Sequence, residues 1–370
     1  MSKKTAPRRD PLRASFLRRL LPALVLVLAS AAGACSPAYV LRAGWEEAKI
    51  LHRRHPIAKI IADPGTAPDR RAKLQLVLDA RAYARDSLHL KVGKSYTLFS
   101  EVKSDTLALV LSAARKDRFT GYSWWFPIVG RVPYKGFFRE EDARKEMRRL
   151  EAAGYDTYLR PTSAFSTLGW FTDPLLSTLL RYDSVELGNT VIHEVTHNTI
   201  YVGGQAMWNE SFASFVGSRG AIRYFCGREG EQSPNCRQAR DSWSDDLVFG
   251  QFMTDLVARL EALYARTDLT AQQKVEQREA VFEQARQDFR VRVQPRFKAG
   301  TYGSFLTAPL NNATLISRRL YYGRLELFER VYQSRGEDLP RTIADIVAAA
   351  KGSKDPYAAV QALLPPGQGL

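Results

Sequence analysis

The sequence predicts an α+β protein in which a mixed sheet precedes a mainly helical C-terminal half. Short apolar runs bounded by Gly and Pro, typical of strands, fall between about residues 92 and 172. From about 173 to 350, apolar residues instead recur at helical spacing within charged segments. We therefore expect a single folded unit over 36–350, followed by a C-terminal helix and a disordered tail within 351–370.

The composition is that of an ordinary globular protein and argues against a nucleic-acid partner. The 370 residues are 45% hydrophobic and 25% charged, with a net charge of +15. Part of that charge lies at the N-terminus, and we interpret the Arg-rich runs 144–149 and 318–324 as solvated helix faces. A basic surface of this kind is compatible with anionic lipid head groups.

The N-terminus is typical of a targeting segment. A basic stretch precedes the apolar run 20–29, which is too short to span a bilayer as a helix. The run leads into Ala32-Gly33-Ala34-Cys35, where small residues before a cysteine resemble a lipobox. We expect 1–34 to be a signal peptide and Cys35 to be lipidated; the alternative is an ordinary signal peptide cleaved near Ala34. Both predict export to a bacterial envelope, and Ser36 after the cysteine favours the outer membrane and periplasm.

The two remaining cysteines agree with export. Cys226 and Cys236 flank a polar segment of nine residues and form an even pair. Disulfides persist in oxidising compartments, so we expect these two cysteines to be bonded. A cysteine zinc site is disfavoured because no histidine lies nearby in the sequence.

Several segments before residue 173 have clear local patterns. Helical periodicity predicts helices over 40–61, 68–88 and 140–153, and apolar runs predict strands over 106–111, 124–129, 156–160 and 164–171. The helix 140–153 is placed to cross over between two strands.

The C-terminal half reads as a series of helices. A short helix is expected to begin at Asp173-Pro174, and further helices are expected over 184–201, 209–225, 237–265, 270–291, 311–335, 339–351 and 356–364. Gly203-Gly204 separates the second and third of these and permits a sharp reversal of the chain.

The segment 193–197 carries the sharpest chemical signal, because it spells His-Glu-Val-Thr-His in an apolar run. Positions i and i+4 of a helix lie on one face, so His193 and His197 can both bind a single Zn²⁺. Glu194 then lies beside them, where a carboxylate can take a proton from a water that the metal activates. The alternative interpretation, which involves no metal, is an amphipathic helix that happens to contain two histidines.

A zinc peptidase needs a third protein ligand and an open fourth position. Glu210 is the best candidate, because an antiparallel return after the double glycine would set it opposite His193 and His197. The competing carboxylates are Glu186, Asp241, Asp245 and Asp246.

Two supporting roles are also expected near the metal. Asn209 is placed to hydrogen-bond across the helix pair. An oxyanion donor is needed as well, and the candidates are Tyr201, Tyr321 and Tyr322.

These segments together resemble the bacterial putative aminopeptidase family of exported zinc metallopeptidases. The resemblance rests on His193–His197, Asn209–Ala213, Ser166–Ser177 and Asn311–Ala313, and it covers about residues 36 to 350. It implies a gluzincin-like fold with ligands His193, His197 and Glu210, base Glu194 and oxyanion donor Tyr321. It also implies that strand 164–171 binds extended substrate by strand addition. This chain differs from the usual family residues at Thr196, Asn198 and Trp208. These differences leave the expected metal ligands and the expected base unchanged.

The sequence thus predicts an exported, lipid-anchored zinc peptidase, with one Zn²⁺ per chain and a peptide as substrate. The aminopeptidase activity comes from the resemblance. The alternatives are a zinc endopeptidase or processing protease with the same site, and a non-catalytic zinc-binding envelope lipoprotein. No protein partner is predicted.

Overall fold

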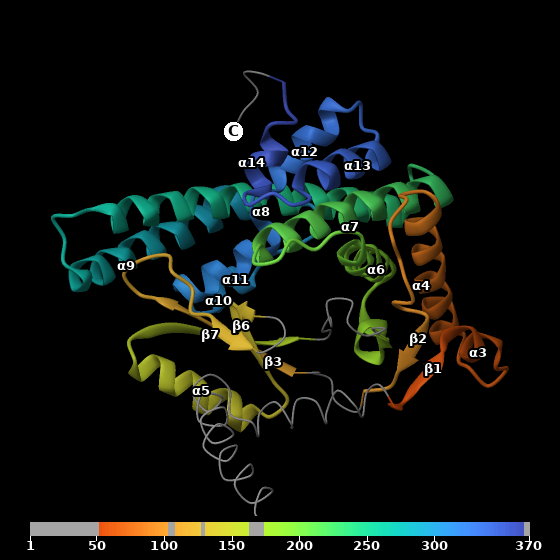
Figure 1. The fold of residues 1–370 in the computed structure, drawn as a ribbon, viewed down its shortest axis with the longest axis horizontal. Helices are drawn as coiled ribbons and strands as arrows, with labels where there is room; N and C mark the ends of the chain where they lie inside the picture. Colours follow the sequence, from red (N-terminus) through yellow and green to blue (C-terminus); the bar gives the residue numbers. More distant parts are fainter. Residues whose placement is uncertain (1–51, 103–107, 127–129, 163–173, 366–370) are drawn as a thin grey trace, which may run out of the picture.

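The computed structural model describes residues 52–102, 108–126, 130–162 and 174–365. The predicted signal peptide, Cys35, the helix over 40–51 and the strand 164–171 lie outside these residues. Within them the chain has the predicted α+β arrangement, with small sheets in the N-terminal part and a mainly helical C-terminal half (Figure 1). The gluzincin-like fold stays a prediction.

The first described segments form a small sheet with a helix beside it. Strand β1 (Arg54–Pro56) pairs antiparallel with β2 (Leu98–Ser100), which pairs parallel with β8 (Leu175–Leu176). The expected helix over 40–61 is therefore wrong at 54–56, because a proline disfavours helical geometry at the residue before it and His55 is extended. Helix α3 (Ile57–Ala62) follows directly, and α4 (Pro68–Asp86) confirms the next predicted helix.

A second sheet has the strand order β6-β3-β7 and is antiparallel throughout. Its strands are β3 (Ala108–Arg115), β6 (Tyr134–Phe137) and β7 (Tyr155–Thr162). Helix α5 (Glu140–Ala152) connects the two outer strands across β3, as predicted, and ends at Gly154, whose φ of 81° suits glycine. A hairpin of β4 (Trp124–Phe126) and β5 (Gly130–Val132) lies between β3 and β6 in the sequence.

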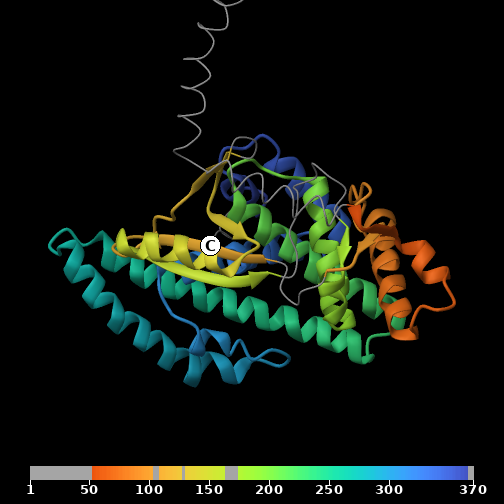
Figure 2. The same cartoon turned by 90° about the horizontal axis from the view of Figure 1, so that it is seen from below.

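The two faces of this sheet differ in character. Leu111 and Ala113 pack with Ala143 and Leu150 of α5 in an apolar cluster. Side chains alternate along a strand, so Asp156 and Arg160 of β7 point to the opposite face. That face is covered by a helix from the C-terminal half, α11 (Asn312–Tyr322) (Figures 1 and 2).

The rest of the chain is helical. Its elements are η1 (Ser177–Arg181), α6 (Ser184–Thr199), α7 (Ala206–Glu229), α8 (Pro234–Ala265), α9 (Ala271–Asp288), η2 (Phe289–Val293), η3 (Gln294–Arg296), α10 (Ser304–Thr307), α11, α12 (Leu325–Ser334), α13 (Leu339–Ala350) and α14 (Pro356–Gln361). Figure 1 shows α8 as a long rod, with α12, α13 and α14 on one side of it and the sheet on the other.

The structure corrects three element predictions. The helix expected over 311–335 is two helices, because Gly323 ends α11 and Arg324 has a left-handed φ of 55°. The helix expected from Asp173-Pro174 is strand β8 followed by a 3-10 turn, within the part that is described. Strands β1 and β8 also lie outside the predicted sheet region of 92–172.

Helices α6 and α7 are in close contact at the centre of the molecule. A Cβ atom at Gly217 of α7 would lie 3.1 Å from the Cβ of His193 and would collide with Asn189. Buried residues on both sides of this contact, including Val191, Val195 and Phe212, join the main hydrophobic core. The absence of a side chain at Gly217 therefore sets how near the two helices come.

A disulfide joins Cys226 at the end of α7 to Cys236 at the start of α8, as expected. In the described ranges, no helix combines the length and apolar character needed to cross a bilayer.

Candidate metal centre

Three residues of α6 and α7 gather into a compact donor set. His193 and His197 lie one turn apart on α6, and Glu210 lies in the first turns of α7. The Nε2 atom of His193 lies 3.4 Å from Oε2 of Glu210, and Nε2 of His197 lies 3.8 Å from Oε1. The side chains are 13%, 7% and 21% exposed respectively, so the set is largely shielded but open on one side.

This donor set fits a zinc ion. Ligands bound tetrahedrally at about 2.1 Å lie roughly 3.4 Å from one another, which is close to the distances seen here. All three ligand atoms lie within 4.8 Å of one another. Two imidazoles and a carboxylate form a donor set found in zinc hydrolases that keep a fourth position for water.

The turn between the helices is held by Asn209. Its amide nitrogen donates to the carbonyl oxygen of Val202 at 2.9 Å, and its amide oxygen accepts from the Val202 N–H at 2.9 Å. Gly204, with a φ of 75°, allows the reversal that precedes α7. Asn209 thus supports the metal ligands through the loop next to Glu210, rather than through a hydrogen bond to a histidine.

The electrostatics of the set favour metal-binding protonation states at Glu210 and His197. Burial lowers the pKa of His197 to about 4. Burial alone would raise the pKa of Glu210, but its hydrogen bond with His193 and the nearby positive charges hold that pKa below its ordinary value. At His193 burial lowers the pKa, yet the same hydrogen bond and the Glu194 and Glu210 charges raise it overall.

Tyr321 faces the donor set from α11. Its ring centroid lies 6.4 Å from that of His193. Burial and the charge of Glu210 raise the pKa of Tyr321 to about 12, so the phenol keeps its proton at neutral pH. The charge of Glu194 contributes to the same shift in the Tyr321 pKa.

The other two tyrosines considered from the sequence differ from Tyr321 in their surroundings. The ring centroid of Tyr322 lies 4.9 Å from that of Phe249, and the side chain packs between the main core and the Phe249 cluster. Tyr201 lies at the end of α6 with 45% of its surface exposed, and the charge of Glu210 still raises its pKa after the larger effect of burial.

Two site residues were missed by sequence reasoning. Arg160 of β7 lies with its guanidinium 5.9 Å from the Tyr321 ring centroid and its Nη2 3.5 Å from the Tyr321 hydroxyl. Tyr134 of β6 lies on the same sheet face, and burial together with the charge of Glu210 raises its pKa. Alternation of polar side chains along β7 was the available signal, but nothing local indicated that α11 would cover that face.

Polar contacts fix α11 on the sheet. Asn311 caps the helix by accepting from the Thr314 N–H, and it donates to the carbonyl of Thr157 on β7. Asn312 donates to the carbonyl of Arg115 on β3. These bonds carry Tyr321, three turns later, to its place opposite α6.

A buried ion pair anchors the same junction. Arg278 of α9 donates to both carboxylate oxygens of Asp156, at 2.6 and 3.0 Å, and both side chains are 6% exposed. Asp156 also accepts from the Asn312 N–H at 3.1 Å. The sheet, α9 and the start of α11 thus meet at one carboxylate.

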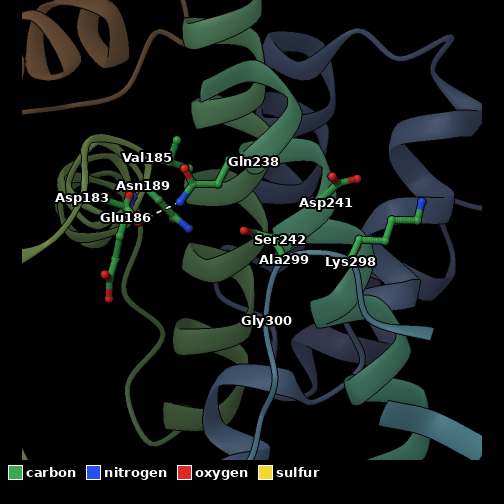
Figure 3. A pocket seen from close by; sticks show the side chains of 10 residues that line it. All are labelled: Asp183, Val185, Glu186, Asn189, Gln238, Asp241, Ser242, Lys298, Ala299 and Gly300. Carbon is green, nitrogen blue, oxygen red and sulfur yellow. Dashed lines mark hydrogen bonds between the residues drawn. The ribbon is translucent and has the colours of Figure 1, made fainter. Parts of the chain in front are cut away.

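The competing carboxylates lie outside the donor set. Glu186 and Asp241 line a pocket of about 530 Å³ between the start of α6, α8 and the segment 298–300 (Figure 3). The Asp245 carboxylate accepts hydrogen bonds from the backbone N–H groups of that segment. The Asp246 carboxylate accepts a hydrogen bond from the hydroxyl of Tyr302. Neither the pocket nor these aspartates supplies a fourth side chain to the triad.

A second cluster of metal-type side chains is explained by covalent chemistry. Glu231 lies near Cys226 and Cys236, but both sulfurs are committed to the disulfide. In the described part of the chain, His193, His197 and Glu210 are therefore the group suited to a metal ion.

Comparison with known proteins gives one match. The family model described as putative aminopeptidase matches residues 38–359, so the chain belongs to this family. No curated protein and no solved structure matches the chain.

Proposed function

From the family and the donor set, we propose that this protein is an exported zinc-dependent peptidase of the aminopeptidase type. The observation that carries the proposal is the placement of two imidazoles and a carboxylate opposite each other on α6 and α7, within 3.8 Å. The side chains of Glu194 and Tyr321 beside that set supply the remaining chemistry of a hydrolase.

His193, His197 and Glu210 would hold the ion. A bound zinc ion would supply a Lewis acid that polarises a carbonyl and lowers the pKa of water. The remaining steps belong to side chains of this chain.

Glu194 is the proposed general base. Hydrolysis of a peptide adds water across the amide, which requires a group that removes a proton from water and returns it to the leaving amine. Glu194 neighbours the first ligand on α6, and its charge acts on both His193 and Tyr321. One carboxylate at this position serves both proton transfers.

Tyr321 is the proposed oxyanion donor. A donor aimed at the developing negative charge is worth about 10²–10³ in rate. Because burial raises its pKa to about 12, the Tyr321 hydroxyl remains a donor throughout the neutral range.

The place of action is proposed from the N-terminal sequence. The basic and apolar segment before Cys35 supports export, and lipidation of Cys35 would tether the peptidase to the outer membrane, facing the periplasm. The disulfide between Cys226 and Cys236 supports an oxidising compartment.

The test measures zinc content and peptide hydrolysis in the wild type and in Glu194→Gln. We expect about one zinc per chain in both proteins, with hydrolysis lowered about 10²–10⁴-fold only in the variant. Glu186→Gln is the matched control, since Glu186 is exposed on the same helix and lies outside the donor set. A wild type without zinc, or hydrolysis that survives Glu194→Gln, would exclude the proposed mechanism.

A further inference from the structure

We propose that Arg160 binds the free C-terminal carboxylate of the substrate, so that the peptidase acts on di- and tripeptides. The inference rests on the proposed function. It adds a substrate class that family membership does not specify.

Arg160 is rigidly placed for this role. It pairs with Val110 in the β3–β7 ladder, and its neighbours on β7 are tied to β3 along the whole strand. Its side chain reaches the same face of the sheet as Tyr134, on the opposite outer strand. A guanidinium on a sheet is better fixed in position than one on a loop.

The ring of Tyr321 lies near both Arg160 and His193. The guanidinium lies 5.9 Å from the centre of the Tyr321 ring, and that centre lies 6.4 Å from the centre of the His193 ring. A carboxylate on the leaving-group side of a bond held at the donor set falls within this span.

The charge of Arg160 is not neutralised by a carboxylate of the described residues, where no ion pair joins it. The buried arginines Arg278 and Arg219 instead pair with Asp156 and Glu329. Arg160 instead contacts the hydroxyl of Tyr321, with its Nη2 3.5 Å from that oxygen. A guanidinium without a carboxylate partner presents a planar pair of N–H donors, which matches the two oxygens of a carboxylate.

The acidic groups at the site are already committed. Within the described residues, Glu210 belongs to the donor set and Glu194 is the proposed base. Among the described residues that contact Tyr321, Arg160 therefore supplies a cation with no carboxylate partner, which suits an anionic group of the substrate.

The test compares the dipeptide Ala-Phe with Ala-Phe amide and Ala-Glu amide. Binding is measured by calorimetry on zinc-loaded Glu194→Gln protein, with and without Arg160→Gln, and hydrolysis is measured on the wild type. We expect Ala-Phe to bind about 10- to 100-fold more tightly than Ala-Phe amide, and Arg160→Gln to abolish that preference. Arg160→Lys should keep part of it, and Arg148→Gln, on the exposed face of α5, should change nothing.

Three results would overturn the proposal. Equal binding of Ala-Phe and Ala-Phe amide would show that the carboxylate is not recognised. Equal weakening of both by Arg160→Gln would assign Arg160 to Tyr321 instead. Tight binding of Ala-Glu amide would assign it to acidic side chains. A carboxylate preference in binding, without hydrolysis by the wild type, would support the Arg160 site while removing the proposed function.

Discussion

The two halves of the candidate site are built in different ways. The metal half lies on two helices joined by a short turn, so His193 and Glu210 are brought together by local structure. The opposite half combines Arg160 and Tyr134 of the sheet with Tyr321 of α11, and 161 residues separate Arg160 from Tyr321. The first half carries the proposed metal ligands, and the second carries the side chains proposed to act on the substrate.

This difference implies that metal binding and turnover can be separated. The metal half depends on the α6–α7 contact and on Asn209, which braces the turn. The substrate half depends on how α11 is docked, which Asp156, Asn311 and Asn312 control from the far end of the helix. Four substitutions test whether the halves fail independently.

Glu210→Gln should have the largest effect. Replacing the only carboxylate of the donor set removes a charged ligand, so zinc content should fall well below one per chain and hydrolysis should drop to background. Elemental analysis after dialysis measures the first, and a peptide assay the second. Full zinc occupancy in Glu210→Gln would break the assignment of Glu210 to the metal half.

Asp156→Asn should destabilise the protein while sparing the metal. The substitution removes the buried partner of the Arg278 charge and leaves only the exposed Glu279, which costs up to about 3–5 kcal/mol. We expect a lower Tm and slower turnover, with zinc content retained because the donor set does not touch Asp156. Glu101→Gln, in the exposed pair with Arg70, should cost less than about 1 kcal/mol. Loss of zinc in Asp156→Asn would show that the halves are coupled.

Tyr321→Phe should lower kcat about 10²–10³-fold and leave zinc content and Tm near their wild-type values. The reason is that the hydroxyl acts on the transition state, while the ring keeps its packing. Tyr322→Phe is the matched control, since its ring points into the Phe249 cluster. Equal losses in both variants would contradict the role of Tyr321.

Asn209→Ala should have the smallest effect. It leaves the Val202 N–H without its partner and removes one of two hydrogen bonds to the Val202 carbonyl, at a cost of about 1–3 kcal/mol. Zinc affinity should fall about 10-fold, because the turn that places Glu210 is loosened. Metal titration against a chelator measures this, with Asn235→Ala in the first turn of α8, where the side chain bonds Glu229 at the surface, as control. An unchanged affinity would show that the α6–α7 contact alone suffices.

The sequence predicted the metal half of the site more completely than the half that contains Arg160, Tyr134 and Tyr321. The i, i+4 spacing of His193 and His197 and the double glycine are local signals, and they predicted the helix pair and Glu210 as its third ligand. Tyr321 was one of three tyrosine candidates from the sequence, and the family resemblance selected it, because nothing near it in the sequence indicates the helix it faces. Arg160 and Tyr134 were missed since their role depends on which helix covers the sheet. The break at Arg324 was missed because periodicity continues through it.

The lack of a side chain at Gly217 affects which metal ion would fit the proposed centre. Because α7 approaches His193 so closely there, the donor atoms can lie about as near to one another as a small tetrahedral cation requires. Gly217→Ala would push α6 and α7 apart and lengthen the distances between the ligand atoms of the donor set. Longer distances between ligand atoms suit larger ions that accept longer bonds and more ligands, such as Ca²⁺. We therefore expect Gly217, which lies outside the donor set, to influence which ionic radius the proposed centre prefers.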